Sequence, residues 1–343
     1  MPFSLLKKNP RLILKQVILI LGFLLSSAAQ SAVQKNTQKN FTIQIDNDIL
    51  FGTDREYTGG LKLYYNDAHL KLNDQLITPI KSLLGSYFSK SLATSTRRQD
   101  QFEFSMEIYT IRQKSNGKTL QSLTNTAWAS LSLKRFYQFN TANALPIYYH
   151  LGMRLGWIGP SNGGEQIQNG FHHLIGNKSE KGWDKQPFDQ PTFQLGFERQ
   201  SLIYQSPHKT LNAYWTSWGE VGSPRTDLYL GIGGYLQKNA HPIFYHNFPN
   251  RPIEHNSDWG YFLFTNISLS YDFYNLMRDG RPFTKDPPLI PQLSPWRLKS
   301  HVGLGIQHGA HSFSFTVTRW QQFYAKQPET AFHFASLVYN FAY

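Results

Sequence analysis

The sequence predicts an all-β protein, an antiparallel transmembrane β-barrel of about twelve strands with a short helix in one outer loop. Three observations support this fold class. Only 16% of the 343 residues are charged while 15% are aromatic, a balance that argues against a disordered chain. The mean hydropathy of −0.43 excludes a bundle of membrane helices. Finally, many segments alternate polar and apolar residues with a period of two.

The N-terminal 32 residues have the three parts of a secretory signal peptide. An apolar run at 17–25 is followed by small residues at 26–32, and it is preceded by the basic residues Lys7, Lys8, Arg11 and Lys15. Cleavage would lower the formal net charge from +12 to +8 and leave residues 33–343 as one barrel domain. An uncleaved anchor is the alternative, although the run is short for a spanning helix.

The period of two is clearest in residues 149–157 and 261–273. One face of the second segment carries Tyr261, Leu263, Thr265, Ile267, Leu269, Tyr271 and Phe273, and the other carries Asn266, Ser268, Ser270 and Asp272. A lipid-facing apolar band around a polar interior produces this pattern. The sheet must close, because hydrocarbon cannot satisfy the backbone of a free edge strand.

We count twelve such segments, an even number as in bacterial barrels. They lie near 41–48, 58–66, 101–112, 126–139, 146–157, 192–204, 208–219, 226–237, 259–273, 299–309, 311–321 and 329–343, and the last ends on an aromatic residue. Between them, 76–94 has the pattern of an amphipathic helix, and the proline-rich stretch 279–298 is expected to be an irregular loop. The long stretches 67–100 and 238–258 would be periplasmic turns. Because such turns are usually short, a miscount by one strand pair is an alternative. A soluble periplasmic β-sandwich or barrel is another.

Two segments carry side chains suited to chemistry. In the first, Asp46-Asn47-Asp48 ends a strand and Asp54 and Glu56 follow shortly after. Oxygen ligands of this kind suit Ca²⁺ better than zinc. A turn rich in Asn and Asp explains the same residues without a metal, because their side chains bond to their own backbone.

The second segment follows the strand that ends near Trp157. A short helix is expected from Gly164 to a C-cap at Gly176, with Ile167, Phe171 and Leu174 or Ile175 on its packed face. Gln168 and His172 are four residues apart and therefore share another face, beside Glu165. A histidine is the usual general base near neutral pH. The alternative is a histidine that only binds a backbone carbonyl or a lipid phosphate.

Strand parity brings these two segments together. Strands one and five run in the same direction, so the loops after them open at the same, outer end of the barrel. The acidic cluster and the histidine can therefore meet at one rim.

Together, the two segments resemble the lipid A 3′-O-deacylase family. The matching residues are Asn47-Asp48, Thr53-Asp54-Arg55, Tyr57-Thr58-x-Gly60, Gly156 to Pro160, Gly164 to Asn169, His172, Leu174 to Gly176, Gly182-Trp183-Asp184-x-Gln186 and Asn275-Leu276-Met277-x-Asp279-Gly280. The resemblance implies a calcium-dependent esterase in the bacterial outer membrane. It implies that the enzyme acts on lipid A of lipopolysaccharide in the outer leaflet, with no nucleic-acid partner.

The resemblance also implies roles for individual residues. His172 is the base for a water nucleophile, with Gln168 one turn before it, and Asn47 and Asp48 hold calcium and the reacting carbonyl. Thr58 lines the same pocket. A family acidic residue after the histidine has no direct match, because Lys178 and Ser179 stand there, and Glu180 is the closest carboxylate for the calcium shell. Four basic residues of the rim loops suit the phosphates of an anionic glycolipid: Arg55, Lys178, Lys181 and Lys185.

In one further place the sequence departs from the family. The family's Arg-Pro-Tyr-Ala-Gly stretch entering the fourth strand is replaced by residues 126–130, Thr-Ala-Trp-Ala-Ser. This change is expected to affect barrel packing rather than the site.

Three other functions remain as alternatives. Outer-membrane phospholipase A is also a calcium-dependent barrel, but it uses a His-x-Ser-Asn-Gly motif, and here Gly159 stands in the place of that histidine before Ser161. A porin or adhesin barrel would have no catalysis at all. A zinc site at His172 and His173 is opposed by helix geometry, because adjacent side chains point about 100° apart.

Overall fold

The structure is a computed structural model. It describes residues 39–48, 51, 56–67, 97–115, 119–141, 144–174, 179–186, 189–240, 256–281, 293–324 and 331–342. Several sequence predictions lie outside these residues. They are the signal peptide at 1–32, the amphipathic helix at 76–94, the helix end at Ile175 and Gly176, the rim residues Arg55 and Lys178, and the terminal aromatic residue Tyr343.

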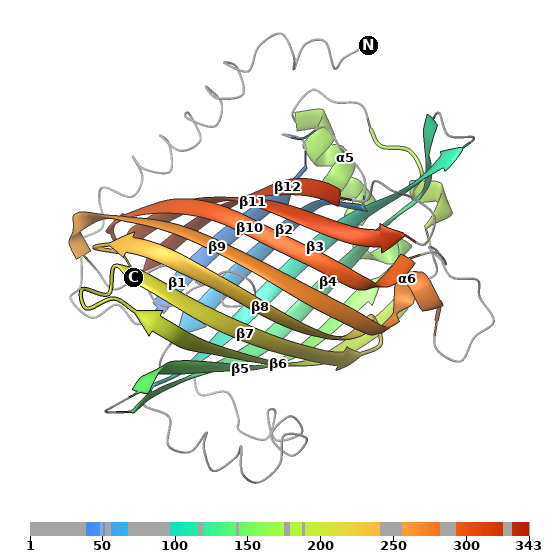
Figure 1. Ribbon diagram of the computed structural model, residues 1–343. Coiled ribbons are helices and arrows are strands. Elements are labelled where there is room, and N and C mark those ends of the chain that lie inside the picture. Colours follow the sequence, from blue (N-terminus) through green and yellow to red (C-terminus); the bar gives the residue numbers. More distant parts are fainter. Residues whose placement is uncertain are drawn as a thin grey trace.

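Twelve antiparallel strands form one closed barrel, as the sequence predicts (Figure 1). Each strand pairs with the next along the chain. Their bounds are β1 Lys39–Asn47, β2 Glu56–Asp67, β3 Arg97–Ser115, β4 Thr119–Thr141, β5 Ala144–Ile158, β6 Gln190–Gln205, β7 Leu211–Gly222, β8 Arg225–Lys238, β9 Asn256–Asn275, β10 Leu293–Gly309, β11 His311–Tyr324 and β12 Ala331–Ala342.

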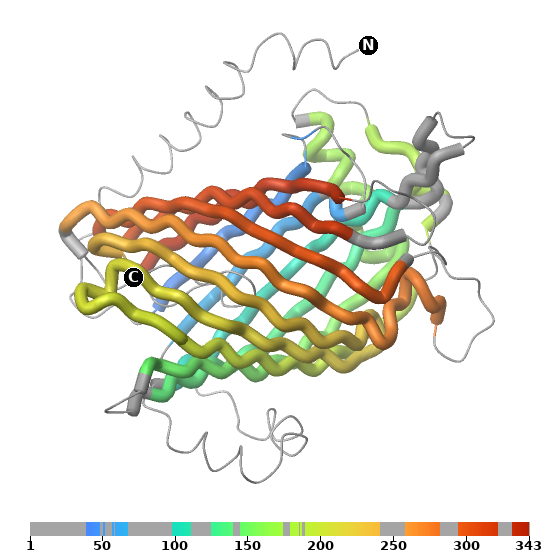
Figure 2. Tube along the Cα trace, in the orientation of Figure 1, coloured from blue at the N-terminus to red at the C-terminus, as the bar shows by residue number. Residues whose placement is uncertain are grey.

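The barrel closes between the first and last strands, where Asn40 lies opposite Ala342 and Asn47 lies opposite Ala335. The start of β1 and the end of β12 therefore share one rim, and β1 and β5 both end at the other rim (Figure 2). The prediction for 279–298 is partly wrong. β10 begins at Leu293, which pairs with Tyr324 of β11, and from Trp296 on it also pairs with β9.

Side chains alternate between the lumen and the outside of the barrel. On β1, Thr42, Gln44 and Asp46 are buried in the lumen, while Ile45 is exposed on the outside. Other exposed outward side chains are also apolar, and they include Leu131, Leu155, Leu228, Leu230, Val302 and Leu304. An apolar exterior around a polar interior is the reverse of a water-soluble barrel and matches a lipid environment.

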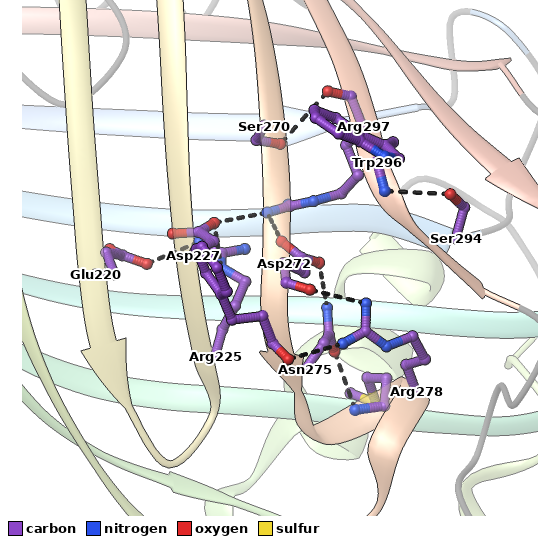
Figure 3. Close-up of polar contacts among 12 residues, drawn as sticks. Glu220, Arg225, Asp227, Ser270, Asp272, Asn275, Arg278, Ser294, Trp296 and Arg297 are labelled. Carbon is purple, nitrogen blue, oxygen red and sulfur yellow. Dashed lines mark hydrogen bonds and ion pairs between the residues drawn. The ribbon is translucent and has the colours of Figure 1, made fainter.

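Ion pairs among the consecutive strands β7 to β10 line the outer part of the lumen (Figure 3). Arg297 Nη2 lies 2.6 Å from Asp227 Oδ2 and also contacts Asp272. Arg225 pairs with Glu220 and with Asp227, each at 2.9 Å. These side chains come from β7, β8, β9 and β10, and the charged groups of the described strands enclose a cavity of about 150 Å³.

The described helices are short. They are η1 Pro160–Asn162, α5 Gly164–Leu174 and η2 Trp183–Lys185 between β5 and β6, and α6 Leu276–Asp279 after β9. None of these described helices is long and apolar enough to span a membrane.

Candidate functional site

Helix α5 lies beside the barrel wall near the outer rim (Figure 1). Its first residue, Gly164, sits directly on β4, because a Cβ built on Gly164 would be 2.2 Å from the Cβ of Ala127. Asn162 joins the helix to the wall. Its Oδ1 accepts a hydrogen bond from the Gly164 N–H at 2.9 Å, and its amide nitrogen donates to the Ala127 carbonyl. Only glycine allows the helix to start this close to β4.

The helix contacts the outside of the barrel, as the alternation on β3 and β4 shows. Glu107 and Trp128 line the cavity in the lumen and lie opposite each other in the register. Their neighbours Ile108 and Ala127 form the next pair, so they point outward. Both are nevertheless buried, because Trp183 of η2 covers this part of the outer wall.

Trp183 also fixes the helix. Its indole Nε1 donates a hydrogen bond to Gln168 Oε1 at 3.0 Å, while its ring packs on Met106, Ile108 and Ala127. Gln168 is 6% exposed. The hydrogen bond from Trp183 occupies the amide oxygen of Gln168. The amide nitrogen of Gln168 carries two further N–H donors.

The strand register connects this wall to Asn47. Asn47 lies opposite Gly59, Gly59 opposite Ile108, and Ile108 opposite Ala127. All four occupy one outward row, and a Cβ built on Gly59 would be 3.6 Å from Asn47 Nδ2. Three strand spacings of about 4.8 Å separate Asn47 from Ala127, about 14 Å along the wall. The end of β1 and the start of α5 therefore lie on the same outer face of the barrel.

The expected calcium ligands are oxygen donors. Asp48 follows β1 and is 3% exposed, and its carbonyl accepts from the Phe51 N–H at 2.9 Å. The backbone N–H of Glu180 donates to Asn169 Oδ1 at 2.8 Å, which holds Glu180 against α5. Within the described ranges, no three His, Asp or Glu side chains gather closely enough to hold a metal. The donor set fits calcium in kind, while its completion requires amide, backbone, water or substrate oxygens.

The prediction that Ile167 and Phe171 lie on the packed face of the helix is wrong. Ile167 is 42% exposed and Phe171 36% exposed, whereas the polar Gln168 is buried. The reason is the surface on which the helix lies. Its contact with the wall is made through Gly164 and through Trp183, whose indole needs a polar partner. His172 is half-buried, and as the fourth residue after Gln168 it shares the side of that amide.

Of the predicted substrate-binding residues, Thr58 and Lys181 belong to the part of the chain that the structure describes. Thr58 lies in β2, one residue before Gly59. Lys181 is exposed, and its carbonyl accepts from Asn125 Nδ2 at 3.1 Å. The next carbonyl, that of Gly182, accepts from the Asn125 N–H at 3.2 Å. Asn125 thus attaches the segment before η2 to the first part of β4.

Ser161 has a structural partner. Its hydroxyl donates to Asp189 Oδ1 at 2.7 Å and its backbone N–H donates to the same oxygen at 3.0 Å. The indole of Trp157 is a third donor, at 2.9 Å. These hydrogen bonds, those from Ser161 first, lower the pKa of the Asp189 carboxyl. Among the described contacts of Ser161 there is no histidine, which a serine nucleophile would require.

Sequence reasoning predicted Gln168 and His172 as site residues, but it did not predict that Trp183 and Asn125 fix their loop. Trp183 belongs to the motif quoted for the family, and an aromatic residue directly after Gly182 in a polar loop was the available signal. For Asn125 the sequence gives no signal, because its role depends on a contact with residues 56 positions away.

Comparisons with known proteins agree with this architecture. The sequence profile of a family described as outer membrane protein LpxR matches residues 17–343. The solved structure of LpxR from Salmonella typhimurium is similar, with a TM-score of 0.65 and 18% identity, over 89% of this chain and 100% of that one. The β-domain of the Bordetella autotransporter BrkA matches with a TM-score of 0.45 and 8% identity, over 90% of this chain and 100% of that one. No curated protein matches by sequence.

Proposed function

Because this chain belongs to the family of the outer membrane protein LpxR, we propose that it is a lipid A 3′-O-deacylase of the bacterial outer membrane. It hydrolyses the ester that links the 3′-acyloxyacyl group to lipid A in the outer leaflet. One observation carries the proposal. Gln168 and His172 lie on a helix held against the outer face of the barrel, the same face that carries Asn47. A site on this face can be reached by a lipid from the bilayer.

The reaction needs a water molecule activated at His172. The imidazole takes a proton from the water, and the resulting hydroxide attacks the ester carbonyl carbon. The bond between that carbon and the sugar oxygen then breaks. The acyl chain leaves as a free carboxylic acid, and the sugar oxygen takes the proton and remains as a 3′-hydroxyl.

Gln168 stabilises the charge that develops on the carbonyl oxygen. Its own oxygen is held by Trp183, so it offers N–H donors to a ligand. Donors fixed in advance toward a developing oxyanion are usually worth a large part of the rate enhancement. Trp183 is a positioning residue in this arrangement, because it touches Gln168 and not the substrate.

Calcium is the metal that the available donors favour. Asn47, Asp48 and Glu180 would supply side-chain oxygens, and the described part of the site contains no cysteine or cluster of histidines for a softer metal. When bound, the ion supplies Lewis-acid polarisation of the ester carbonyl. Arg55 and Lys181 would contact the phosphates of lipid A, and Thr58 would line the pocket.

The alternatives receive less support. A porin needs an open lumen, whereas charged and aromatic side chains of the described strands, with Arg297 and Arg225 among them, project into the lumen and line a cavity of about 150 Å³. A phospholipase A mechanism needs a serine beside a histidine, whereas the Ser161 hydroxyl donates to Asp189.

The proposal is tested with purified protein in detergent. Lipid A is incubated with the wild type, and the products are measured by mass spectrometry with and without a calcium chelator. We expect loss of the 3′-acyloxyacyl group, inhibition by the chelator and recovery on addition of Ca²⁺. Asp48→Asn should be strongly impaired, whereas the control Asp258→Asn, at the opposite rim, should be fully active. Wild-type activity that persists in the chelator, or an Asp48→Asn variant as active as the wild type, would overturn the calcium assignment.

A further inference from the structure

Helix α5 has an apolar side that the barrel does not cover. Ile167 and Phe171 are four residues apart, so they lie on one side of the helix. They are 42% and 36% exposed, whereas Gln168 on the neighbouring side is 6% exposed. A loop helix in water normally buries its apolar side and exposes its polar side. Here the apolar side is exposed, and the neighbouring side that carries Gln168 is buried.

The location of the helix accounts for this reversal. It rests on the outward side of β3 and β4, through the contact of Gly164 with Ala127 and through Trp183. The outward side of a membrane barrel faces lipid and not water. An uncovered apolar side on a helix beside that wall therefore faces the same surroundings as the wall.

The strand that leads into the helix, β5, also carries outward apolar side chains near the outer rim. Trp157 and Leu155 on β5 are exposed and point outward, and six residues lie between Trp157 and the start of the helix. Tryptophan is enriched at the boundary between headgroups and acyl chains. The polar residues Glu165 and Gln166 are exposed on other sides of the helix. They can remain among headgroups while the apolar side enters the acyl layer.

We propose that α5 is inserted in the outer leaflet, with Ile167 and Phe171 among lipid acyl chains. The inserted helix holds the side of Gln168 and His172 at the boundary between acyl chains and headgroups, beside the wall. An ester near the boundary of that layer then reaches the site sideways from the leaflet, without leaving the membrane. The sideways entry rests on the proposed function, whereas the insertion does not.

The insertion is tested with spin labels on single cysteines, since the natural chain contains no cysteine. Ile167→Cys and Phe171→Cys are labelled in the protein reconstituted in lipid vesicles. Collisions of each label with oxygen and with a water-soluble nickel complex are measured. Leu155→Cys on the barrel wall is the lipid-exposed control, and Gln166→Cys on α5 is the water-exposed control.

We expect the labels at 167 and 171 to match the label at 155, with high oxygen and low nickel accessibility. Nickel accessibility equal to that at 166 would overturn the insertion, whether or not the protein is an esterase. The sideways entry is tested with the double variant Ile167→Ser, Phe171→Ser. We expect KM for lipid A in vesicles to rise about tenfold while kcat in detergent micelles is unchanged. An unchanged KM in vesicles would overturn sideways entry.

Discussion

Replacing Trp183 with phenylalanine separates the two contacts of this side chain. Phenylalanine retains an aromatic ring over Met106, Ile108 and Ala127 but cannot donate to Gln168. The hydrogen bond orients the Gln168 amide with its N–H groups as the free donors. Without it, the amide can turn over and present its oxygen to the developing negative charge.

The size of the effect follows from the energy of the lost hydrogen bond. A net hydrogen bond contributes about 0.5–1.5 kcal/mol, and about 1.4 kcal/mol corresponds to a factor of ten in rate. We therefore expect kcat to fall about 2- to 13-fold, with KM for lipid A unchanged. Gln168→Leu, which removes the donors themselves, should cost about 100-fold or more. Adding Trp183→Phe to Gln168→Leu should cause no further loss, because the hydrogen bond is already absent.

The assay is the rate of acyl release from lipid A in detergent, measured by mass spectrometry. Trp128→Phe is the matched control. The Trp128 indole also donates a buried hydrogen bond, to Thr192 at 2.9 Å, but it lies inside the barrel. We expect this control to retain full activity. Equal losses in Trp128→Phe and Trp183→Phe, or additive losses with Gln168→Leu, would refute the positioning role.

Three further predictions concern the supports of the site. Gly164→Ala places a methyl group against Ala127, so activity should fall at least tenfold and recover in part in the double variant with Ala127→Gly; no recovery would contradict the close contact. Because the pKa of Asp189 is lowered, its hydrogen bonds to Ser161 should persist from pH 7 to about 4 and be lost as the pH falls through the folded-state pKa. Hydrogen exchange of the Ser161 amide measures this, with Asp189→Ala, which has no side-chain acceptor, unprotected throughout. Arg297→Ala leaves two lumen carboxylates without this partner, so unfolding in urea should show a loss of about 3–5 kcal/mol, while the folded fraction keeps its activity.

Most of the fold follows from local sequence patterns. The alternation in residues 261–273 reflects one side in lipid and one in the lumen, and it survives in β9 over the whole predicted range. Strand ends were less predictable, since β4 extends to Thr119 through pairing with β3 alone. Such an extension depends on a partner strand, which periodicity within one segment does not report.

The site was predictable only in part, for a similar reason. The spacing of Gln168 and His172 follows from helix geometry, and strand parity brings them to the same rim as Asn47. The orientation of the helix did not follow. An apolar stripe at Ile167 and Phe171 predicts a packed side in water, whereas beside a lipid-facing wall the same stripe can remain exposed. The sequence pattern is identical in the two environments, so only the position of the helix outside the barrel distinguishes them.

The central claim is that a site on the outer face of the barrel, at Asn47 and His172, removes an acyl group from lipid A. The most direct measurement is mass spectrometry of lipid A from cells that express either the wild type or His172→Ala, at matched amounts of folded protein in the outer membrane. The account predicts that lipid A loses the 3′-acyloxyacyl group with the wild type and keeps it with the variant. An identical acyl pattern in the two strains would contradict it.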